Sequence, residues 1–520
     1  MATTSSNSVK NAKYLGFVYG QKKNFCVFVV DPDAQKLVCN TDVEENEIQD
    51  FMKNIPTVFN EKFKAVFLNI GGYQPQNYSC NYEFCKEVKA ALNSCNIPNH
   101  FFTQFQWYFS GLLITSGYIP NVDDYVLFIT QFDDEANVFC YKFTENGYIN
   151  VGWKDVDISE ENHDNNIRAE MLEFFPHPSA IFITAATKKM KRLKAIFRNL
   201  KVFSSAQDFS FGDPKFISEH SKWFFDKSYT NFYVLPDAPS NVSIFLEEGT
   251  AQRPFINVYV DKTHLPFSRT VNAQKVVNYC CVALSINGSK TILERWLPNQ
   301  NAHEHDVTLS IDEEGFLSYE IKAILWPHVD IFLSKLTKKL KSGIPVIALI
   351  ENLSFICVRK DGISDYEYLE SWNGKFGMDL HISFNEEKPK YCQNAVEAAR
   401  TKPTFAVFDI FPTMTVAPEN IDTIKNYQFK ITKDDENPVL LEFDSFDGTR
   451  KAASPAFLFA MLLKQHLKAI KNETGKKVKE IALSTFAELD DEELKRVQTQ
   501  LMEACEMLKI SGTFLDFKEF

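Results

Sequence analysis

The stretch Val307-Thr-Leu-Ser-Ile-Asp-Glu-Glu-Gly-Phe-Leu317 predicts a β-hairpin in the second half of this 520-residue chain. Its apolar residues alternate with polar ones, as they do in a strand with one buried face. The turn Asp-Glu-Glu-Gly follows, and Gly315 supplies the left-handed backbone position that such a turn needs. We therefore expect strands over 306–311 and 317–321.

The residues around this hairpin predict a compact all-β unit over 229–323. Short apolar runs are separated by turn residues, and none shows the 3.6-residue period of a helix. Under 100 residues of this kind are typical of a β-sandwich. The expected strands are Val242–Leu246, Phe255–Val260, Val276–Leu284, Asp306–Ile311 and Leu317–Ile321.

The flanking regions alternate strand and helix patterns, so the chain is expected to be a multidomain α/β protein with an inserted β-unit. The helix expected after the β-unit is amphipathic, and we interpret it as a connector. Among the later elements we expect a helix over 392–400, a strand over 404–411 and an antiparallel pair, 428–431 with 440–443. The expected divisions are a disordered N-terminus 1–11, an α/β domain 12–228, the β-unit 229–323, a connector 324–343 and an α/β lobe 344–520.

The charge, hydropathy and cysteine content of the sequence argue against several classes of function. The net charge of −12 argues against a nucleic-acid partner or an anionic membrane surface. The polar N-terminus and the lack of a long apolar run give no sign of a secretory signal or a membrane span. The eleven cysteines are odd in number and scattered, which is typical of reduced thiols in the cytoplasm. We expect no metal site, since Cys80, Cys85 and Cys95 lack a close Cys-x-x-Cys pair, and His303-Glu-His305 is interpreted as a solvated turn.

The turn Thr130-Gln131-Phe132-Asp133-Asp134-Glu135 lies between two apolar runs and has no glycine. A loop that cradles phosphates needs glycines, so that backbone N–H groups can approach the anion. Three carboxylates in this turn would instead repel a polyphosphate. The hairpin is therefore expected to form without binding a nucleotide.

Several motifs resemble the 70-kilodalton heat-shock (DnaK-type) chaperone family. Val307–Leu317 is similar to the family's Val-Thr-Phe-Asp-Ile-Asp-Ala-Asp-Gly-Ile-Leu, and Phe232–Pro239 stands where the family has its interdomain linker. Further stretches that resemble the family's ATPase domain are Leu15–Gly20, Val126–Ile129, Ile183–Thr187, Asn394–Ala399, Thr404–Asp409, Asn426–Phe429, Ala453–Ala456 and Leu483–Asp490. The resemblance implies an actin-like ATPase fold, shortened and partly duplicated, around an all-β peptide-binding-type sandwich, without a full helical lid.

The chain departs from the family's sequence at the positions that carry the ATPase chemistry. The family's first phosphate loop is replaced by Val18–Lys22 and, in the second copy, by Ala348–Asn352; Phe411 replaces the catalytic lysine and Thr485 the switch proline. Lys22 and Thr187 are the remaining candidates for phosphate contacts. The resemblance therefore implies a degenerate ATPase, with no catalytic or cofactor-binding residue and no cofactor, ATP with magnesium being the candidate if there is one.

By the same resemblance, the residues that would line a peptide groove are Ile244, Leu246, Ala273 and Tyr279. Phe245 adds bulk beside them and Glu247 adds charge, and all four could instead be ordinary core residues. The expected function is that of a pseudo-chaperone that binds extended or unfolded polypeptide without hydrolysing ATP, with co-chaperones as further candidate partners. The alternatives are an ATP-dependent folding chaperone with an unconventional nucleotide site, a weak ATPase, and a purely structural interaction protein. The sequence does not indicate the oligomeric state.

Overall fold

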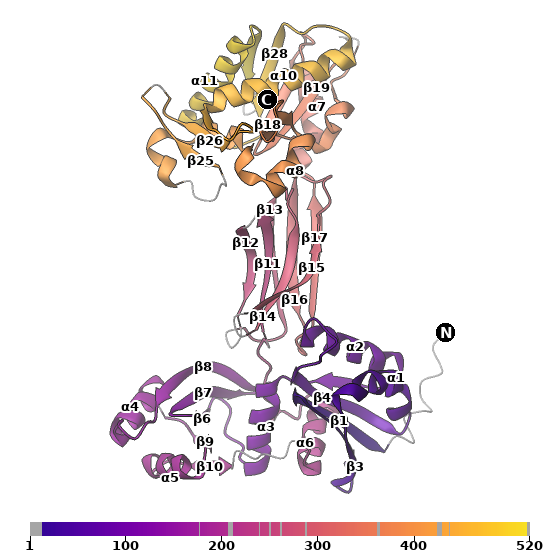
Figure 1. Ribbon diagram of the computed structural model, residues 1–520, viewed down its shortest axis with the longest axis vertical. Coiled ribbons are helices and arrows are strands. Elements are labelled where there is room, and N and C mark those ends of the chain that lie inside the picture. Colours follow the sequence, from indigo (N-terminus) through magenta and orange to yellow (C-terminus); the bar gives the residue numbers. More distant parts are fainter. Residues whose placement is uncertain are drawn as a thin grey trace.

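A computed structural model describes residues 13–175, 177–205, 212–238, 240–248, 251–259, 263–286, 289–360, 364–423, 429–435 and 437–516. The chain forms a mixed α/β protein of several units (Figure 1). An N-terminal unit and a C-terminal unit, both α/β, lie at opposite ends of an all-β middle unit whose strands run along the long axis. The predicted N-terminal segment 1–11 and the motif residues 426–428 lie outside the described residues.

The N-terminal unit begins with a five-stranded sheet of order β3-β2-β1-β4-β5. Its strands are β1 (Tyr14–Lys22), β2 (Asn24–Asp31), β3 (Lys36–Asp42), β4 (Phe63–Tyr73) and β5 (Asn99–Phe101). The first three strands are antiparallel, whereas β4 and β5 run parallel to β1. Helices α1 (Ile48–Val58) and α2 (Asn81–Ser94) share one hydrophobic core with this sheet.

A second sheet of the N-terminal unit repeats this strand order. It contains β6 (Tyr125–Phe132), β7 (Glu135–Thr144), β8 (Gly147–Asp157), β9 (Ala180–Thr184) and β10 (Val202–Ser205), in the order β10-β9-β6-β7-β8. Helices α4 (Asp164–Phe174) and α5 (Thr187–Ile196) belong to this half. Helix α3 (Gln104–Ser116) joins the halves, because Trp107 packs in the core of the first sheet with α6 (Pro214–Phe225), while Phe109 packs in the core of the second.

The C-terminal unit contains a third sheet with the same order. Its path is β20 (Glu367–Tyr368), β19 (Leu353–Val358), β18 (Val346–Ile350), β28 (Glu480–Thr485) and β29 (Ser511–Leu515). Again three strands are antiparallel and the last two are parallel to the first. Helices α10 (Pro455–Thr474) and α11 (Asp491–Met507) share one core with this sheet.

A long insertion separates β20 from α10 in this third sheet. It carries two small three-stranded sheets and the helices α8 (Gln393–Thr401) and α9 (Ile410–Thr415). Its first strand, β21 (Met378–Asp379), pairs with β19 of the third sheet. The two small sheets consist of β22 (Ile382–Ser383), β23 (Lys390–Tyr391) and β24 (Ala406–Val407), and of β25 (Lys430–Thr432), β26 (Leu440–Asp444) and β27 (Arg450–Ala453). The antiparallel pair expected at 428–431 and 440–443 is confirmed as β25 and β26, within the residues described.

The middle unit consists of two antiparallel sheets, β12-β11-β14-β15 and β13-β16-β17. Its strands are β11 (Asn241–Glu248), β12 (Ala251–Val258), β13 (Phe267–Gln274), β14 (Cys280–Ile286), β15 (Ser289–Trp296), β16 (Glu304–Ile311) and β17 (Leu317–Ile324). Ile244 and Val282 of the first sheet share a buried cluster with Val307 and Leu309 of the second. The hairpin predicted at 307–317 is confirmed as β16 and β17, and Gly315 has a φ of 89°.

Two sequence expectations change in the structure. The strand expected over 404–411 is wrong beyond β24, because Asp409 adopts a left-handed backbone with φ 52° and starts α9. This turn lets Ile410 and Phe411 reach the core of the C-terminal unit. The helix expected as a connector, α7 (Pro327–Lys339), buries Val329, Phe332 and Leu336 against the third sheet.

The tip of the β16–β17 hairpin fixes the middle unit to the N-terminal unit. Glu314 is 12% exposed and pairs with Lys89 of α2, and one of its carboxylate oxygens accepts a hydrogen bond from the Phe101 backbone N–H at 2.9 Å. Phe316 packs edge-on against the Phe101 ring at 5.0 Å, and the Leu317 N–H donates to the Tyr82 hydroxyl at 2.9 Å. Desolvation raises the pKa of Glu314, although Lys89 opposes that shift.

Replacing Glu314 with alanine should loosen this attachment, because Lys89 loses a partly buried partner and the Phe101 amide loses its acceptor. A cost of about 1–3 kcal/mol is expected. Hydrogen exchange by mass spectrometry should show faster exchange in peptides that contain Phe101. The control Glu313→Ala removes a carboxylate that is 48% exposed and 3.8 Å from Lys227, and should change exchange little. Equal effects of the two variants would contradict this prediction.

Candidate functional site

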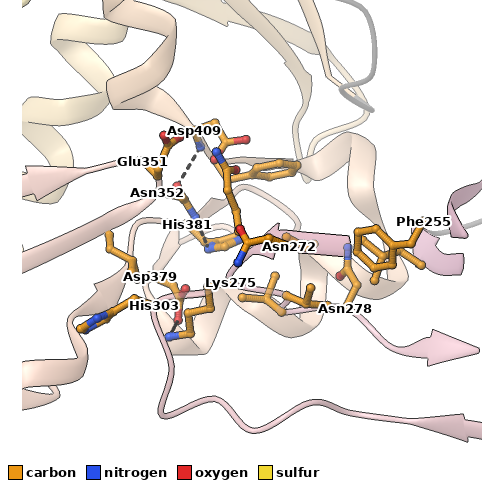
Figure 2. A pocket seen from close by; sticks show the side chains of 18 of the residues that line it. Phe255, Asn272, Lys275, Asn278, His303, Glu351, Asn352, Asp379, His381 and Asp409 are labelled. Carbon is orange, nitrogen blue, oxygen red and sulfur yellow. Dashed lines mark hydrogen bonds and ion pairs between the residues drawn. The ribbon is translucent and has the colours of Figure 1, made fainter. Parts of the chain in front are cut away.

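A cavity of about 490 Å³ lies where the middle unit meets the C-terminal unit (Figure 2). The middle unit contributes the ends of β11 and β12 and the segment 271–278, which runs from β13 toward β14. The C-terminal unit contributes the β18–β19 turn, with Glu351 and Asn352, together with Asp379, His381 and Asp409. The site thus joins residues that are more than a hundred positions apart in the sequence.

The four predicted peptide-binding residues lie in different parts of the structure. Leu246 and Ala273 lie in the wall of this cavity. Ile244 is fully buried between the two sheets of the middle unit and is a core residue in this conformation. Tyr279 does not line the cavity; the Arg295 guanidinium covers its ring at 3.7 Å.

The two departures noted near the predicted groove do not lie in the cavity wall. Phe245 is buried with Cys281 and Ala283, in a cluster separate from the core that holds Ile244. Glu247 forms an ion pair with Arg295 at 2.7 Å. Neither residue lines the cavity, so the expected extra bulk and charge do not enter it.

One buried ion pair holds the two walls together. Lys275 Nζ lies 2.8 Å from Asp379 Oδ2, and both side chains are 5% exposed. Arg400 of α8 adds a second link by donating to the Val277 carbonyl at 2.7 Å. Sequence reasoning missed all of these residues, because nothing in the local pattern around Lys275 or Asp379 indicates a partner 104 positions away.

Asn352 organises the wall on the C-terminal side. Its amide contacts His381 Nδ1 at 3.2 Å, and its carbonyl oxygen accepts a hydrogen bond from the Asp409 N–H at 2.8 Å (Figure 2). Since the amide N–H₂ is a donor, His381 Nδ1 acts as an acceptor, as it does in a neutral imidazole. Burial lowers the pKa of His381 to about 4. Glu351, in the same turn, has a φ of 47°, and burial raises its pKa.

The expectation that His303-Glu-His305 forms a solvated turn is wrong. His303 is 2% exposed and His305 is fully buried. Each ring accepts a backbone N–H at Nδ1, from Trp326 at 2.8 Å and from Val276 at 3.2 Å respectively. The Nε2 atoms lie 2.8 Å from the Lys375 carbonyl and 2.9 Å from the Asn299 carbonyl. Both imidazoles are therefore neutral structural groups, and burial lowers the pKa of each.

At the positions that resemble nucleotide loops, the described side chains contact neighbours within the protein or are exposed. The β6–β7 turn is tight, with Asp133 at φ 51° and both aspartates exposed, and Asp134 pairs with Lys189 of α5 at 2.7 Å. In the C-terminal unit Phe411 is 2% exposed, and the Thr485 hydroxyl donates to the Leu349 carbonyl at 2.9 Å.

The cleft at the carboxyl ends of β18 and β28 is acidic. Open α/β sheets bind ligands at this edge. The cleft has a volume of about 950 Å³ and contains five carboxylates in its lining, from Glu304, Glu351, Glu488, Glu493 and Asp516. Among the described residues that line it, none is a lysine or an arginine. Such a lining disfavours a polyphosphate.

Two further features concern the described part of the chain alone. Within it, no group of three or more His, Cys, Asp and Glu side chains is arranged to hold a metal ion. Helices in the same residues are all too short or too polar to cross a membrane.

No protein-family model matches the chain, and no curated protein matches its sequence.

Acidification should weaken the wall that His381 supports. The pKa of His381 in the folded protein is about 4, below the ordinary value of 6.5. The contribution of the neutral imidazole to the free energy of unfolding is therefore complete above pH 6.5 and is lost as the pH falls toward 4. At pH 5 the loss is about 2 kcal/mol for this group. The measurement is urea unfolding at pH 7 and pH 5.

In this experiment His381→Asn should shrink the difference between the two pH values, even if the variant is less stable at pH 7. The matched control His163→Asn changes an exposed histidine at the start of α4 and should leave the difference as it is in the natural protein. A pH difference that is unchanged in His381→Asn would contradict the assignment.

Proposed function

We propose that this protein is an ATP-independent polypeptide-binding protein, distantly related to the 70-kilodalton heat-shock chaperones, which holds extended segments at the junction of its middle and C-terminal units. The observation that carries the proposal is the cavity itself. Two residues chosen from the motif resemblance, Leu246 and Ala273, converge on its wall.

The topology supports the relationship. In each of the three large sheets, a path of five strands has three antiparallel strands followed by two parallel ones, which is the core order of the actin-like ATPase fold that the motifs imply. Two such sheets stand before the middle unit and one after it, in agreement with a shortened first copy and a partial second copy. The two facing antiparallel sheets of the middle unit agree with a peptide-binding-type sandwich.

The cavity suits an extended chain with one or two apolar side chains. Its volume lies within the range of about 300–1,000 Å³ typical of ligand sites. Leu246, Phe255 and Val276 offer apolar contact, whereas Asn272 and Asn278 offer amide groups that can pair with a peptide backbone. The Asn278 side-chain oxygen is buried and has no hydrogen-bond partner in the structure, so it is available to a backbone N–H.

The C-terminal unit takes the place of a lid in this proposal. It covers the end of the middle unit that would be open in a free sandwich, and Lys275–Asp379 closes the contact. Entry of a long segment then requires the two units to separate at least partly. The binding affinity and the strength of this contact are therefore coupled.

Peptide binding tests the proposal directly. The full chain should raise the fluorescence anisotropy of a fluorescein-labelled Leu-rich heptapeptide in a saturable manner, equally with and without ATP and magnesium. Ala273→Trp should weaken binding at least tenfold, because the new indole fills the cavity. Arg269→Trp is the control, since Arg269 is exposed on the same strand and lies outside the cavity wall.

The alternatives correspond to distinct outcomes of this experiment. Saturable binding that ATP abolishes would favour the ATP-dependent chaperone. If the peptide does not bind at all, the proposal is wrong and a structural interaction protein becomes the better interpretation. An equal loss in both tryptophan variants would place the peptide elsewhere on the molecule.

ATP should not stabilise the protein. The carboxylates of the acidic cleft and of the β6–β7 turn oppose a polyphosphate, and Phe411 replaces a lysine. A millimolar Kd leaves only about 0.4 kcal/mol at millimolar ATP. A melting curve should therefore be unchanged by ATP and magnesium, and phosphate release should equal the blank. A shift of several degrees that disappears in Lys22→Ala or Thr187→Ala would overturn this prediction.

A further inference from the structure

A second cavity, of about 190 Å³, lies at the junction of the N-terminal and middle units, far from the site proposed above. The rings of Tyr82 and Phe101 form the wall on the N-terminal side. Val242, Leu284 and Ile311 form the wall on the side of the middle unit, and each of them is at most 4% exposed. Because these walls belong to the hydrophobic cores of the two units, the cavity is preformed.

The two carboxylates at this cavity are already engaged within the protein, whereas the buried Nε2 of Gln106, also in the lining, has no hydrogen-bond partner among the described residues. Glu314 bonds the Phe101 amide and pairs with Lys89. Asp237 accepts from the Asn150 amide at 2.9 Å and lies 2.8 Å from His264 Nδ1. A ligand therefore meets mainly apolar surface and the one amide of Gln106, while the two carboxylates disfavour an anion.

We propose that this cavity binds a small uncharged apolar molecule of the size of a single aromatic ring. An apolar cavity of about 150 Å³ accepts benzene in a protein core, and this one is somewhat larger. The aromatic rings of Tyr82, Phe101 and Phe316 favour a flat ligand that packs on them edge to face or offset. The bound molecule touches both units and so stabilises the docked hairpin tip of the middle unit.

Fluorobenzene is the probe, and the sample is the full chain with labelled methyl groups on Ile, Leu and Val. Methyl NMR should show saturable shifts at Val242, Leu284 and Ile311, with a Kd on the order of 1 mM or tighter. The ¹⁹F line of fluorobenzene should broaden in parallel. The anionic counterpart 4-fluorobenzoate should produce no shift at these methyl groups at the same concentration.

Two variants locate the ligand. Ala238→Leu adds volume at a lining residue that is 2% exposed and should weaken binding at least fivefold. Its control Ala34→Leu makes the same change in the exposed β2–β3 turn and should bind as the natural protein does. Should Ala238→Leu fail to fold, Leu284→Ala provides the second test, because the enlarged cavity should bind 1-fluoronaphthalene more tightly than the natural protein does.

The absence of methyl shifts up to 5 mM fluorobenzene would overturn the proposal. Shifts confined to Leu246 and Val276 would also overturn it, because they would place the ligand in the cavity of the proposed peptide site. Binding of 4-fluorobenzoate as strong as that of fluorobenzene would refute the assigned ligand class. None of these outcomes depends on whether the protein binds polypeptide.

Discussion

The buried ion pair between Lys275 and Asp379 is the interaction on which the arrangement of the middle and C-terminal units depends. Removing two charges from water is costly, and a buried pair recovers that cost only where its geometry is good. The two charged atoms lie 2.8 Å apart, and both side chains are 5% exposed. Removing either partner would therefore leave the other as an unpaired buried charge and would strongly destabilise the protein. It therefore specifies one relative position of the two units more than it adds stability.

The middle unit is held at its other end by a contact of the same kind. Glu314 at the tip of the β16–β17 hairpin enters a shallow site on the N-terminal unit and meets Lys89 and the Phe101 amide. At each end of the middle unit, a charged contact surrounded by apolar packing thus specifies the position of the neighbouring unit. Both cavities discussed above lie beside these contacts, where two independently folded surfaces meet and cannot interdigitate completely.

Several side chains at positions that resemble nucleotide loops serve the fold. Phe411 contributes to the core of the C-terminal unit, and the Thr485 hydroxyl satisfies the Leu349 carbonyl. Asn352, in a turn that resembles a phosphate loop, holds His381 and Asp409 in place instead. At these positions the side chains are thereby committed to neighbours within the protein.

The sequence by itself determined the local structure of the chain. Period-two alternation and Gly315 were enough to predict the β16–β17 hairpin, and the helix predicted over 392–400 is found as α8. The glycine-free, acidic turn at 130–135 predicts that no polyphosphate binds there, since charge and backbone freedom are properties of the residues themselves. Such features depend on neighbours a few positions away.

Only the tertiary structure decided which residues form the sites. It placed Ile244 in the core, Leu246 and Ala273 on a cavity, and Tyr279 beneath Arg295. It also buried His303 and His305, which the polar local sequence had suggested were exposed. The physical reason is that burial and ion pairing depend on contacts across more than a hundred positions, such as Lys275 with Asp379. A local sequence pattern carries no information on those contacts.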